Sequence, residues 1–362
     1  ICVGFYLLLD LLGVMTEKGR KRVCLTGASG FFGSHLLRHL VMNTDWEIVC
    51  ICSWRYKGTP ERIKQACAGG YEDRVEVITH DLTAPLTETT KKRLGRIDYI
   101  LNIASNSHVD RSIEDPVPFV EGNVSLVLNM LELAREFKPS LFLQFSTDEV
   151  YGPAPKGVDF EEWSTIIPSN PYSASKAAQE AIAISYWRTY GVPVVITNTM
   201  NLFGQTQDPE KYIARLIRNI HNDDVVIVHG KEGDIGSRFY LHARNGADAV
   251  LFIVKNLPPA HYEEDVNMLP DRYNIVGDVE LDNLELAKMV ARIMGRTLKY
   301  ELKNFHFGRP GHDRRYALSG EKLKKLGWKP PFDFERSSMI RASQFTIDFE
   351  LTAPLAIFNM PR

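Results

Sequence analysis

The glycine-rich stretch Thr26-Gly-Ala-Ser-Gly-Phe-Phe-Gly33 constrains the fold of this chain more than any other feature, because it stands between two different hydrophobic patterns. Residues 22–26 form a short apolar, β-branched run that predicts a strand, and the apolar spacing over residues 32–40 predicts a helix. A glycine-rich turn between a strand and a helix is typical of dinucleotide binding. The helix N-terminus would present free backbone amides and positive dipole to phosphate groups.

The glycines of this stretch have different tasks. Gly27 permits the tight turn, Gly30 lets the backbone approach a pyrophosphate, and Gly33 allows the helix to pack closely. Phe31 and Phe32 lie between the last two glycines, at the start of the predicted helix. We therefore expect a dinucleotide cofactor to be bound by Gly27, Gly30, Phe31, Phe32 and Gly33.

Strand and helix patterns alternate beyond this turn, which predicts an α/β fold with a Rossmann-type, doubly wound parallel sheet covered by helices on both faces. The predicted strands after the first cover residues 47–52, 75–78, 99–103, 141–145 and 194–199, and two long helices cover residues 124–137 and 172–190. Residues 15–202 form the predicted dinucleotide-binding domain. Residues 203–330 form a smaller substrate-binding lobe interleaved with returning core elements, and residues 331–362 form a C-terminal tail.

The first residues of the chain differ from the rest. Residues 1–14 are almost wholly apolar, interrupted by Asp10, and are too short to span a bilayer as a helix. Their flanking positive charges follow the apolar run, whereas a secretory signal carries its positive charges first. We interpret residues 1–14 as an upstream leader segment, with a membrane-surface anchor as the alternative.

Two further motifs carry chemistry, Ser146-Thr-Asp-Glu-Val-Tyr-Gly152 and Tyr172-Ser-Ala-Ser-Lys176. A tyrosine and a lysine at this spacing lie on one face of a helix, so the ammonium group can lie beside the phenol and favour the phenolate. Lowering a tyrosine pKa by about three units takes roughly 4 kcal/mol, which Lys176 and an oxidised nicotinamide ring would supply together. The adjacent carboxylates Asp148 and Glu149 add an acid for a leaving hydroxyl and a base for a carbon proton.

Composition excludes several classes of function. The net charge of −2, with 24% charged residues, gives no signature for binding nucleic acid or an anionic membrane. Cys24, Cys50 and Cys52 lie in apolar runs that predict buried strands, so we expect reduced core thiols and a cytoplasmic location. No metal-ligand spacing occurs among the cysteines and histidines, and we predict no metal site.

In this order the three motifs resemble the extended short-chain dehydrogenase/reductase superfamily, and within it the nucleotide-sugar 4,6-dehydratases, above all the dTDP-glucose enzymes. The resemblance runs from about residue 21 to residue 328, and its most specific part is the Asp-Glu pair. Sugar epimerases and decarboxylases of the superfamily share the Tyr-Lys pair but usually lack that aspartate. The other matching stretches are residues 107–112, 209–211, 237–240 and 309–316.

The resemblance implies an NAD-dependent hydro-lyase acting on a glucose-type sugar linked to dTDP or UDP. Such an enzyme forms the 4-keto-6-deoxy sugar by transient oxidation at C4, loss of water across C5 and C6, and return of hydride to C6. Tyr172, beside Lys176, would remove the 4-hydroxyl proton, with Thr147 hydrogen-bonded to that oxygen. Glu149 would take the C5 proton and Asp148 would protonate the departing 6-hydroxyl.

Two other interpretations stay open. One is a nucleotide-sugar 4-epimerase or UDP-glucuronate decarboxylase on the same scaffold, although Asp148 and Glu149 argue against it because neither reaction expels a 6-hydroxyl. The other is an NAD(P)-binding regulatory or scaffold protein, although the intact Thr147, Tyr172 and Lys176 argue against loss of turnover.

The cofactor prediction has one weak point. Cys52 stands where the family usually carries an aspartate that binds the adenosine ribose, and Ser53 and Arg55 follow it. NAD is expected from the family, and NADP is the alternative because the carboxylate that would repel a 2′-phosphate is missing. The resemblance adds to the predicted cofactor site Asp81, Leu82 and Ala104.

Binding of the nucleotide-diphosphate sugar is assigned by the resemblance alone. A planar guanidinium meets phosphate oxygens two at a time, which suits Arg238 and Arg309. The remaining residues expected at the substrate are Ser107, His108, Asn201, Lys211 and His312. Departures from the family pattern at residues 106, 198 and 202 leave the base and the hexose open. In the family the two long helices form a dimer's four-helix bundle, so a homodimer is expected, although the sequence alone also permits a monomer.

Overall fold

A computed structural model gives the structure of the chain and describes residues 19–55, 57–263, 268–304 and 313–334. The leader segment at residues 1–14, most of the predicted tail, and the predicted substrate residues Arg309 and His312 lie outside the described residues.

A seven-stranded sheet forms the centre of the molecule, in the order β11-β6-β5-β4-β1-β2-β3, and each adjacent pair of strands is parallel. The chain order reverses between β1 and β4, and ligands of such sheets bind beyond the carboxyl ends of the strands at this point. The predicted Rossmann-type, doubly wound sheet is confirmed. Its strands are β1 (Arg22–Thr26), β2 (Glu47–Cys52), β3 (Val75–Thr79), β4 (Tyr99–Asn102), β5 (Leu141–Thr147), β6 (Val194–Thr199) and β11 (Asp271–Ile275).

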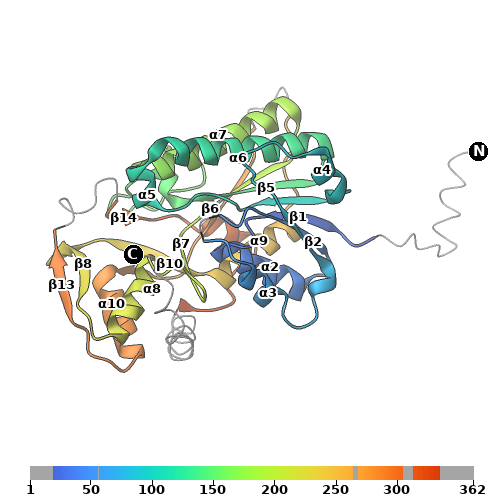
Figure 1. Cartoon of the computed structure of the whole chain (residues 1–362). Helices are drawn as coiled ribbons and strands as arrows, with labels where there is room; N and C mark the ends of the chain where they lie inside the picture. Colours follow the sequence, from blue (N-terminus) through green and yellow to red (C-terminus); the bar gives the residue numbers. More distant parts are fainter. Residues whose placement is uncertain (1–18, 56, 264–267, 305–312, 335–362) are drawn as a thin grey trace, which may run out of the picture.

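Helices cover both faces of this sheet (Figure 1). One face carries α2 (Phe31–Asn43), α3 (Pro60–Cys67) and α9 (Ala243–Asn256), and the other carries α4 (Glu88–Leu94), α6 (Pro116–Phe137) and α7 (Pro171–Tyr190). Both long helices begin with proline at their first position, where its fixed φ suits a helix and its missing N–H costs nothing. For this reason α6 begins well before the predicted residue 124.

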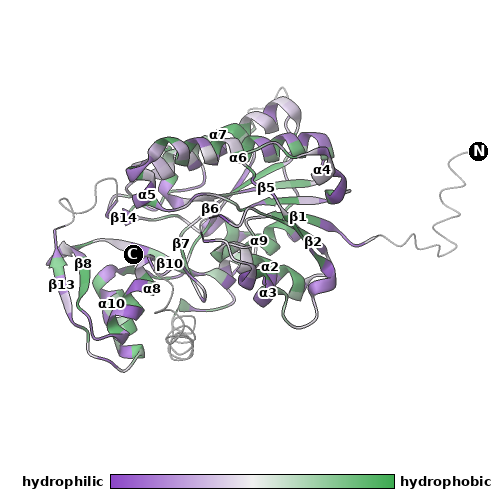
Figure 2. Ribbon diagram, viewed as in Figure 1, coloured by the Kyte–Doolittle hydropathy of each residue, from purple (hydrophilic) through white to green (hydrophobic). Residues whose placement is uncertain are grey.

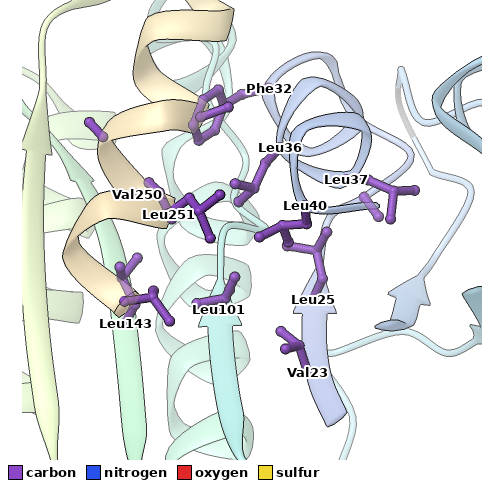
Figure 3. Packing of buried hydrophobic residues seen from close by; sticks show 14 of the residues in the cluster. Val23, Leu25, Phe32, Leu36, Leu37, Leu40, Leu101, Leu143, Val250 and Leu251 are labelled. Atoms are coloured by element: carbon purple, nitrogen blue, oxygen red, sulfur yellow. The ribbon is translucent and has the colours of Figure 1, made fainter. Parts of the chain in front are cut away.

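The core has one apolar layer on each face of the sheet. Val23 and Leu25 of β1 point toward α2 and α9, where they meet Leu36 and Leu40 (Figure 3), whereas Cys24 between them points to the opposite layer. A strand covered on both faces must be apolar throughout, which explains its unbroken hydrophobic run. Each fully buried leucine contributes about 2 kcal/mol relative to an exposed one. In Figure 2 the central strands are accordingly mostly hydrophobic.

A smaller lobe lies beside the sheet and contains two short sheets. One is formed by β7 (Asn201–Phe203), β10 (Ser237–His242), β12 (Glu280–Asp282) and β14 (Arg315–Tyr316), and the other by β8 (Val226–Lys231), β9 (Asp234–Ile235) and β13 (Tyr300–Lys303). The helices α8 (Tyr212–His221) and α10 (Asn283–Ile293) pack on them around a separate apolar cluster. Between these elements the chain returns to the central domain with α9 and β11, and α12 (Glu321–Lys325) follows β14.

Helix α6 is the one described helix that is long and apolar enough to cross a membrane by length and composition. It packs against α7 and β4, and the core helix of a globular protein passes the same test.

Candidate active site

The glycine-rich turn forms a cradle at the switch point of the sheet. Gly27 adopts φ +70°, which favours glycine, and a methyl group on it would lie 2.9 Å from the Cα atom of Ala104. A methyl group on Gly33 would lie only 2.0 Å from the Gly27 carbonyl oxygen. Helix α2 begins after Gly30 with no side-chain cap hydrogen bond and no acidic residue in its first turn. The cradle therefore fits a phosphate group of a dinucleotide.

The end of the site predicted to hold adenosine lies beyond β2 and β3. Cys52 is buried at the end of β2, whereas Ser53 and Arg55 after it are exposed. The Arg55 guanidinium lies 2.7 Å from a carboxylate oxygen of Asp81. Burial opposes the ionised form of Asp81, but hydrogen bonds from Thr83 and the charge of Arg55 outweigh it and lower the pKa of Asp81. The next residue, Leu82, is buried.

A one-turn 3₁₀ helix, η2 (Asp148–Tyr151), carries the two predicted carboxylates directly after β5. Thr147, the last residue of β5, donates from its hydroxyl to Asp148 Oδ1 at 2.9 Å and accepts from the Glu149 amide at 3.4 Å. Asn170 Nδ2 and the Tyr316 hydroxyl both donate to Glu149 Oε2 at 3.4 Å. Polar groups from β5, from the N-cap of α7 and from β14 thus meet at the carboxyl end of β5.

The two carboxyl groups have different electrostatic surroundings. Burial, followed by the negative charge of Glu149, raises the pKa of Asp148 to about 7. Burial also raises the pKa of Glu149, although the positive charge of Lys211 and the hydrogen bond from Asn170 oppose it. Asp148 Oδ2 is buried with no hydrogen-bond partner among the described residues. Asp148 is therefore still protonated in a large share of molecules near neutral pH, as a proton donor requires.

Helix α7 places Tyr172 in its first turn, beside these carboxyls. The Tyr172 amide donates to Ser112 Oγ at 3.1 Å, in the short helix α5 (Val109–Glu114), and its ring meets Phe119 edge-on at 6.2 Å. Burial and the charge of Glu149 raise the pKa of the Tyr172 phenol, and a hydrogen bond with Thr147 opposes them.

Lys176 lies one turn after Tyr172 and is buried. Its ammonium donates to the Phe145 carbonyl at 2.7 Å and to Gln179 Oε1 at 2.6 Å. Burial lowers the pKa of Lys176 to about 7, although the charge of Glu180 opposes this. The sequence predicted a lowered pKa for Tyr172; in this structure that pKa is raised, because burial and Glu149 outweigh the opposing interaction and Lys176 is directed at Phe145 and Gln179.

The predicted substrate residues that the structure describes come from four places: the stretch before α5, strand β7, the start of α8 and strand β10. Lys211, at the start of α8, donates to the Ser107 carbonyl at 3.2 Å, and burial lowers the pKa of Lys211. Asn201 Nδ2 is buried with no hydrogen-bond partner among the described residues. Arg238 donates to the backbone carbonyls of residues 237, 313 and 314 and lies 4.4 Å from the centre of the Tyr316 ring. The guanidinium of Arg238 is therefore held by the lobe itself.

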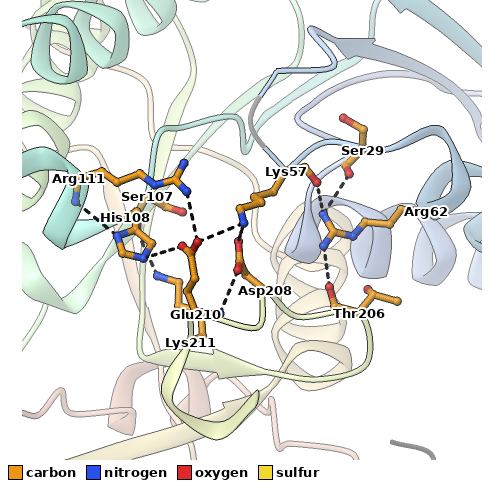
Figure 4. A network of polar contacts seen from close by, with 10 residues as sticks. All are labelled: Ser29, Lys57, Arg62, Ser107, His108, Arg111, Thr206, Asp208, Glu210 and Lys211. Atoms are coloured by element: carbon orange, nitrogen blue, oxygen red, sulfur yellow. Dashed lines mark hydrogen bonds and ion pairs between the residues drawn. The ribbon is translucent and has the colours of Figure 1, made fainter. Parts of the chain in front are cut away.

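A network of charges joins the loop after β2 to the lobe (Figure 4). Glu210 contacts His108 at 3.1 Å, and Arg111 and Lys57 at 3.3 Å. Lys57 also lies 3.4 Å from Asp208. Arg62 donates to the Thr206 carbonyl at 2.7 Å on the same side. We call this set of residues the loop network.

We call residues 147–151 the catalytic turn. The sequence did not identify the residues that contact this turn, and it missed most of the loop network. Asn170 had a detectable signal, since it stands directly before Pro171 and caps α7 through a capping box with Ser173. Lys57 and Asp208 had none, because single charges in loops are usually solvated. No group of three or more His, Cys, Asp or Glu residues suited to a metal occurs within the described ranges.

Fold and site together define an extended short-chain dehydrogenase/reductase of the nucleotide-sugar dehydratase type. The GDP-mannose 4,6 dehydratase family model matches residues 24–340, and the chain belongs to this family.

Curated relatives match along most of the chain. The low-salt glycan biosynthesis protein Agl12 of Haloferax volcanii is 34% identical over 313 residues, which cover 86% of this chain and 94% of the relative. A dTDP-glucose 4,6-dehydratase of Salmonella typhimurium is 32% identical over 87% of this chain and 90% of its own.

Solved structures match the fold of this chain along most of its length. The dTDP-glucose 4,6-dehydratase DesIV of Streptomyces venezuelae, with NAD bound, has a TM-score of 0.79 at 28% identity, covering 92% of this chain and 99% of its own. A UDP-glucose 4-epimerase of Thermus thermophilus, also with NAD, has a TM-score of 0.77 at 26% identity, covering 90% of this chain and 99% of its own.

Proposed function

We propose that this protein is an NAD-dependent 4,6-dehydratase of a nucleotide-diphosphate hexose and releases the 4-keto-6-deoxy sugar. The observation that carries the proposal is the catalytic turn. Thr147, Asp148 and Glu149 follow one strand end, Tyr172 lies against them, and Asp148 has a pKa of about 7 beside a second carboxyl group. Curated dTDP-glucose 4,6-dehydratases at 30–33% identity support the same activity.

Each residue of this set has one task in the proposed reaction. Tyr172 takes the proton of the sugar 4-hydroxyl, and Thr147 holds that oxygen by a hydrogen bond. Lys176 provides the positive charge on the same helix face. Glu149 removes the C5 proton, and Asp148 delivers a proton to the departing 6-hydroxyl. NAD, when bound in the glycine-rich cradle, would supply reversible oxidation by accepting hydride from C4 and returning it to C6, and a proton returned to C5 completes the product.

The main rival is a 4-epimerase or decarboxylase on this scaffold, and epimerases are among the structures of similar fold. Neither reaction expels a 6-hydroxyl, so neither needs a protonated carboxyl group such as Asp148 beside Glu149. A regulatory NAD(P)-binding protein is the non-enzymatic rival. It would need no proton donor and acceptor at the end of β5.

NAD rather than NADP is the proposed cofactor. Arg55 is the cation near the adenosine end that would attract a 2′-phosphate, but it pairs with Asp81 at 2.7 Å. The Asp81 carboxylate would also repel such a phosphate. It thereby provides part of the discrimination against NADP that is lost because Cys52 stands where the family carries an aspartate. NAD and NADP added separately to the cofactor-free protein should give activity with NAD and little with NADP. Equal activity with both would refute this choice.

The substrate is proposed to be a dTDP- or UDP-linked glucose-type sugar. Purified protein would be incubated separately with dTDP-glucose, UDP-glucose and UDP-N-acetylglucosamine and analysed by mass spectrometry for loss of one water. Water loss from one of them identifies base and hexose together. Cofactor reduction without water loss would favour another reaction of the same scaffold that begins with oxidation, such as epimerisation or decarboxylation. No reaction of the folded, cofactor-loaded protein with any of the three sugars would contradict the proposed substrate class.

We further propose that the protein is a cytoplasmic homodimer. Helix α6 carries the exposed apolar side chains of Val117 and Leu128, which a four-helix bundle of α6 and α7 from two chains would cover. Light scattering should give twice the chain mass, and Leu128→Glu should lower it to that of a monomer. The cytoplasmic location is supported by Cys24, Cys50 and Cys52, which are free and buried thiols. Fractionation of the source cells tests it.

A further inference from the structure

Two charges lie fully buried behind the catalytic turn. Glu180 belongs to α7, and Arg272 belongs to β11 at the edge of the sheet. Both side chains are 0% exposed, and their charged atoms lie 2.9 Å apart. Removing two charges from water costs several kcal/mol for each ion, so such a pair is weak evidence for stability. Its contacts indicate another task.

Glu180 is linked to the strand end that carries Thr147. Asn198 Nδ2, in β6, donates to Glu180 Oε1 at 2.8 Å and to the Thr147 carbonyl at 3.0 Å. One side-chain amide therefore joins the carboxylate to the backbone at the start of η2. Glu180 also lies on the helix face of Tyr172 and Lys176, one turn after the lysine and two turns after the tyrosine.

Arg272 is linked to the other end of the same turn. Its Nη1 donates to the hydroxyl of Tyr151, the last residue of η2, at 3.2 Å. That hydroxyl donates in turn to the Glu162 carbonyl at 2.8 Å. The Arg272 guanidinium is further fixed over the Trp163 ring, 4.2 Å from its centre. The ion pair thus connects both ends of the segment that holds Asp148 and Glu149.

The pair also sets the charge near Lys176. Within the described residues, Glu180 is the charged group that acts on the Lys176 ammonium, whereas β5 meets it with a carbonyl oxygen and Gln179 with an amide oxygen. The carboxyls of η2, Asp148 and Glu149, act instead on Tyr172. Arg272 pairs with Glu180 and so limits the negative charge that Lys176 experiences.

We propose that Glu180 and Arg272 are positioning residues of the active site, which hold the catalytic turn at both ends and set the charge beside the Tyr-Lys pair. This role rests on the proposed dehydratase reaction. It acts through Thr147, Tyr151 and Lys176, because neither member of the pair is assigned a contact with the substrate. Small displacements of reacting groups cost much rate, so the effect falls on turnover more than on binding.

The first test separates positioning from stability. In the double variant Glu180→Leu/Arg272→Met both charges are replaced by apolar groups, a change that is often neutral or stabilising for a buried pair. We expect its melting temperature to stay near that of the wild type, while kcat falls about 10- to 100-fold and KM changes little. A folded double variant with wild-type kcat would overturn the proposal.

The second test uses the direction of pH shifts. Glu180→Gln removes the negative charge that favours the Lys176 ammonium, so the alkaline limb in the rate of the first oxidation, a step in which Asp148 donates no proton, should move to lower pH. Arg272→Met leaves Glu180 unopposed, so the limb should move to higher pH. Loss of packing alone gives no reason for opposite shifts. If both variants shift the limb in the same direction, or if neither shifts it, then Glu180 and Arg272 do not set the charge beside Lys176.

A matched control comes from the opposite end of the sheet. Asp98 is another buried carboxylate, paired with Arg96 at 2.8 Å and Lys21 at 3.4 Å. Asp98→Asn should lower stability without moving the pH profile, and a shift equal to that of Glu180→Gln would remove the support for a special pair.

Hydrogen–deuterium exchange makes the outcome independent of turnover. The amides of residues 148–152 should exchange faster in the double variant than in the wild type, and should not do so in Asp98→Asn. Unchanged exchange refutes the positioning role even in an active dehydratase. Faster exchange in a protein that dehydrates no nucleotide sugar would uphold the positioning of the turn and refute the proposed function instead.

Discussion

Asp148→Asn is expected to stabilise this protein at alkaline pH while it slows the elimination of water. The pKa of Asp148 is raised from 3.8 to about 7, because the carboxyl group is buried and lies next to Glu149. An unfolded chain releases this proton at a lower pH than the folded protein does. The folded state therefore loses stability as pH rises from the unfolded pKa to the folded one, and above about pH 7 the full penalty applies.

The size of the effect follows from the two pKa values. A shift of about three units corresponds to roughly 4 kcal/mol, of which about 1.5 kcal/mol is already lost at pH 5. The asparagine side chain has no charge to bury, so its stabilising effect should be about 2 to 3 kcal/mol larger at pH 8 than at pH 5. With about 2.1 cal/mol/K of unfolding entropy per residue, the melting temperature of the variant should gain about 3 °C more at pH 8.

The assay is thermal unfolding of wild type and variant at both pH values, with the rate of water loss measured on the same samples. A general acid contributes about 10²- to 10⁴-fold, so water loss should slow by this order while the first oxidation at C4 is kept. An equal change in melting temperature at both pH values would refute the reasoning, because it would show that the charge of Asp148 is not what destabilises the fold.

Four further predictions concern the rest of the site. Tyr172→Phe should abolish cofactor reduction. Glu149→Gln should still reduce the cofactor but stall before water loss. If mass spectrometry shows full product from Glu149→Gln, then Glu149 does not remove the C5 proton. Gly33→Ala should lower NAD affinity by 100-fold or more in fluorescence titration, since its methyl group meets the Gly27 carbonyl at 2.0 Å, and an unchanged affinity would show that the turn adapts. Lys57→Ala should speed cofactor release, because the ion pairs of Lys57 hold the loop whose Thr59 amide donates to the Ser29 carbonyl of the glycine-rich turn. The effect should be larger at low salt than at high salt, because ion pairs at exposed side chains are screened; Lys64→Ala on α3, outside the loop network, serves as its control.

Much of the fold followed from local patterns. The first two strands lie at the predicted residues because unbroken apolar runs suit strands covered on both faces. Boundaries were less accurate where caps decide them. Strand β5 continues to Thr147 rather than ending at residue 145, and α6 begins at Pro116, because turn residues and proline signal weakly in a hydrophobic pattern.

The site was less accessible to sequence reasoning. The motifs predict Asp148, Glu149 and Tyr172 as catalytic residues. The pKa shifts of these groups come chiefly from burial, and a sequence motif does not show how deeply a side chain is buried. The sequence also predicted Arg238 at a diphosphate, but it gave no indication that this guanidinium donates to the carbonyl at the start of β10 and to two carbonyls just before β14. Such contacts depend on how the lobe packs against itself.

The sequence by itself determined the strand–turn–helix of the cofactor cradle, the alternation of strands and helices along the first 200 residues and the residue types at the end of β5. These depend on φ/ψ preferences and hydrophobic periodicity, which act between near neighbours in the chain. Only the tertiary structure decided that Glu180 and Arg272 meet behind the catalytic turn, and that Lys57 reaches Glu210 across the loops. Contacts of this kind join segments far apart in the sequence, and their partners are set by how the helices and strands pack.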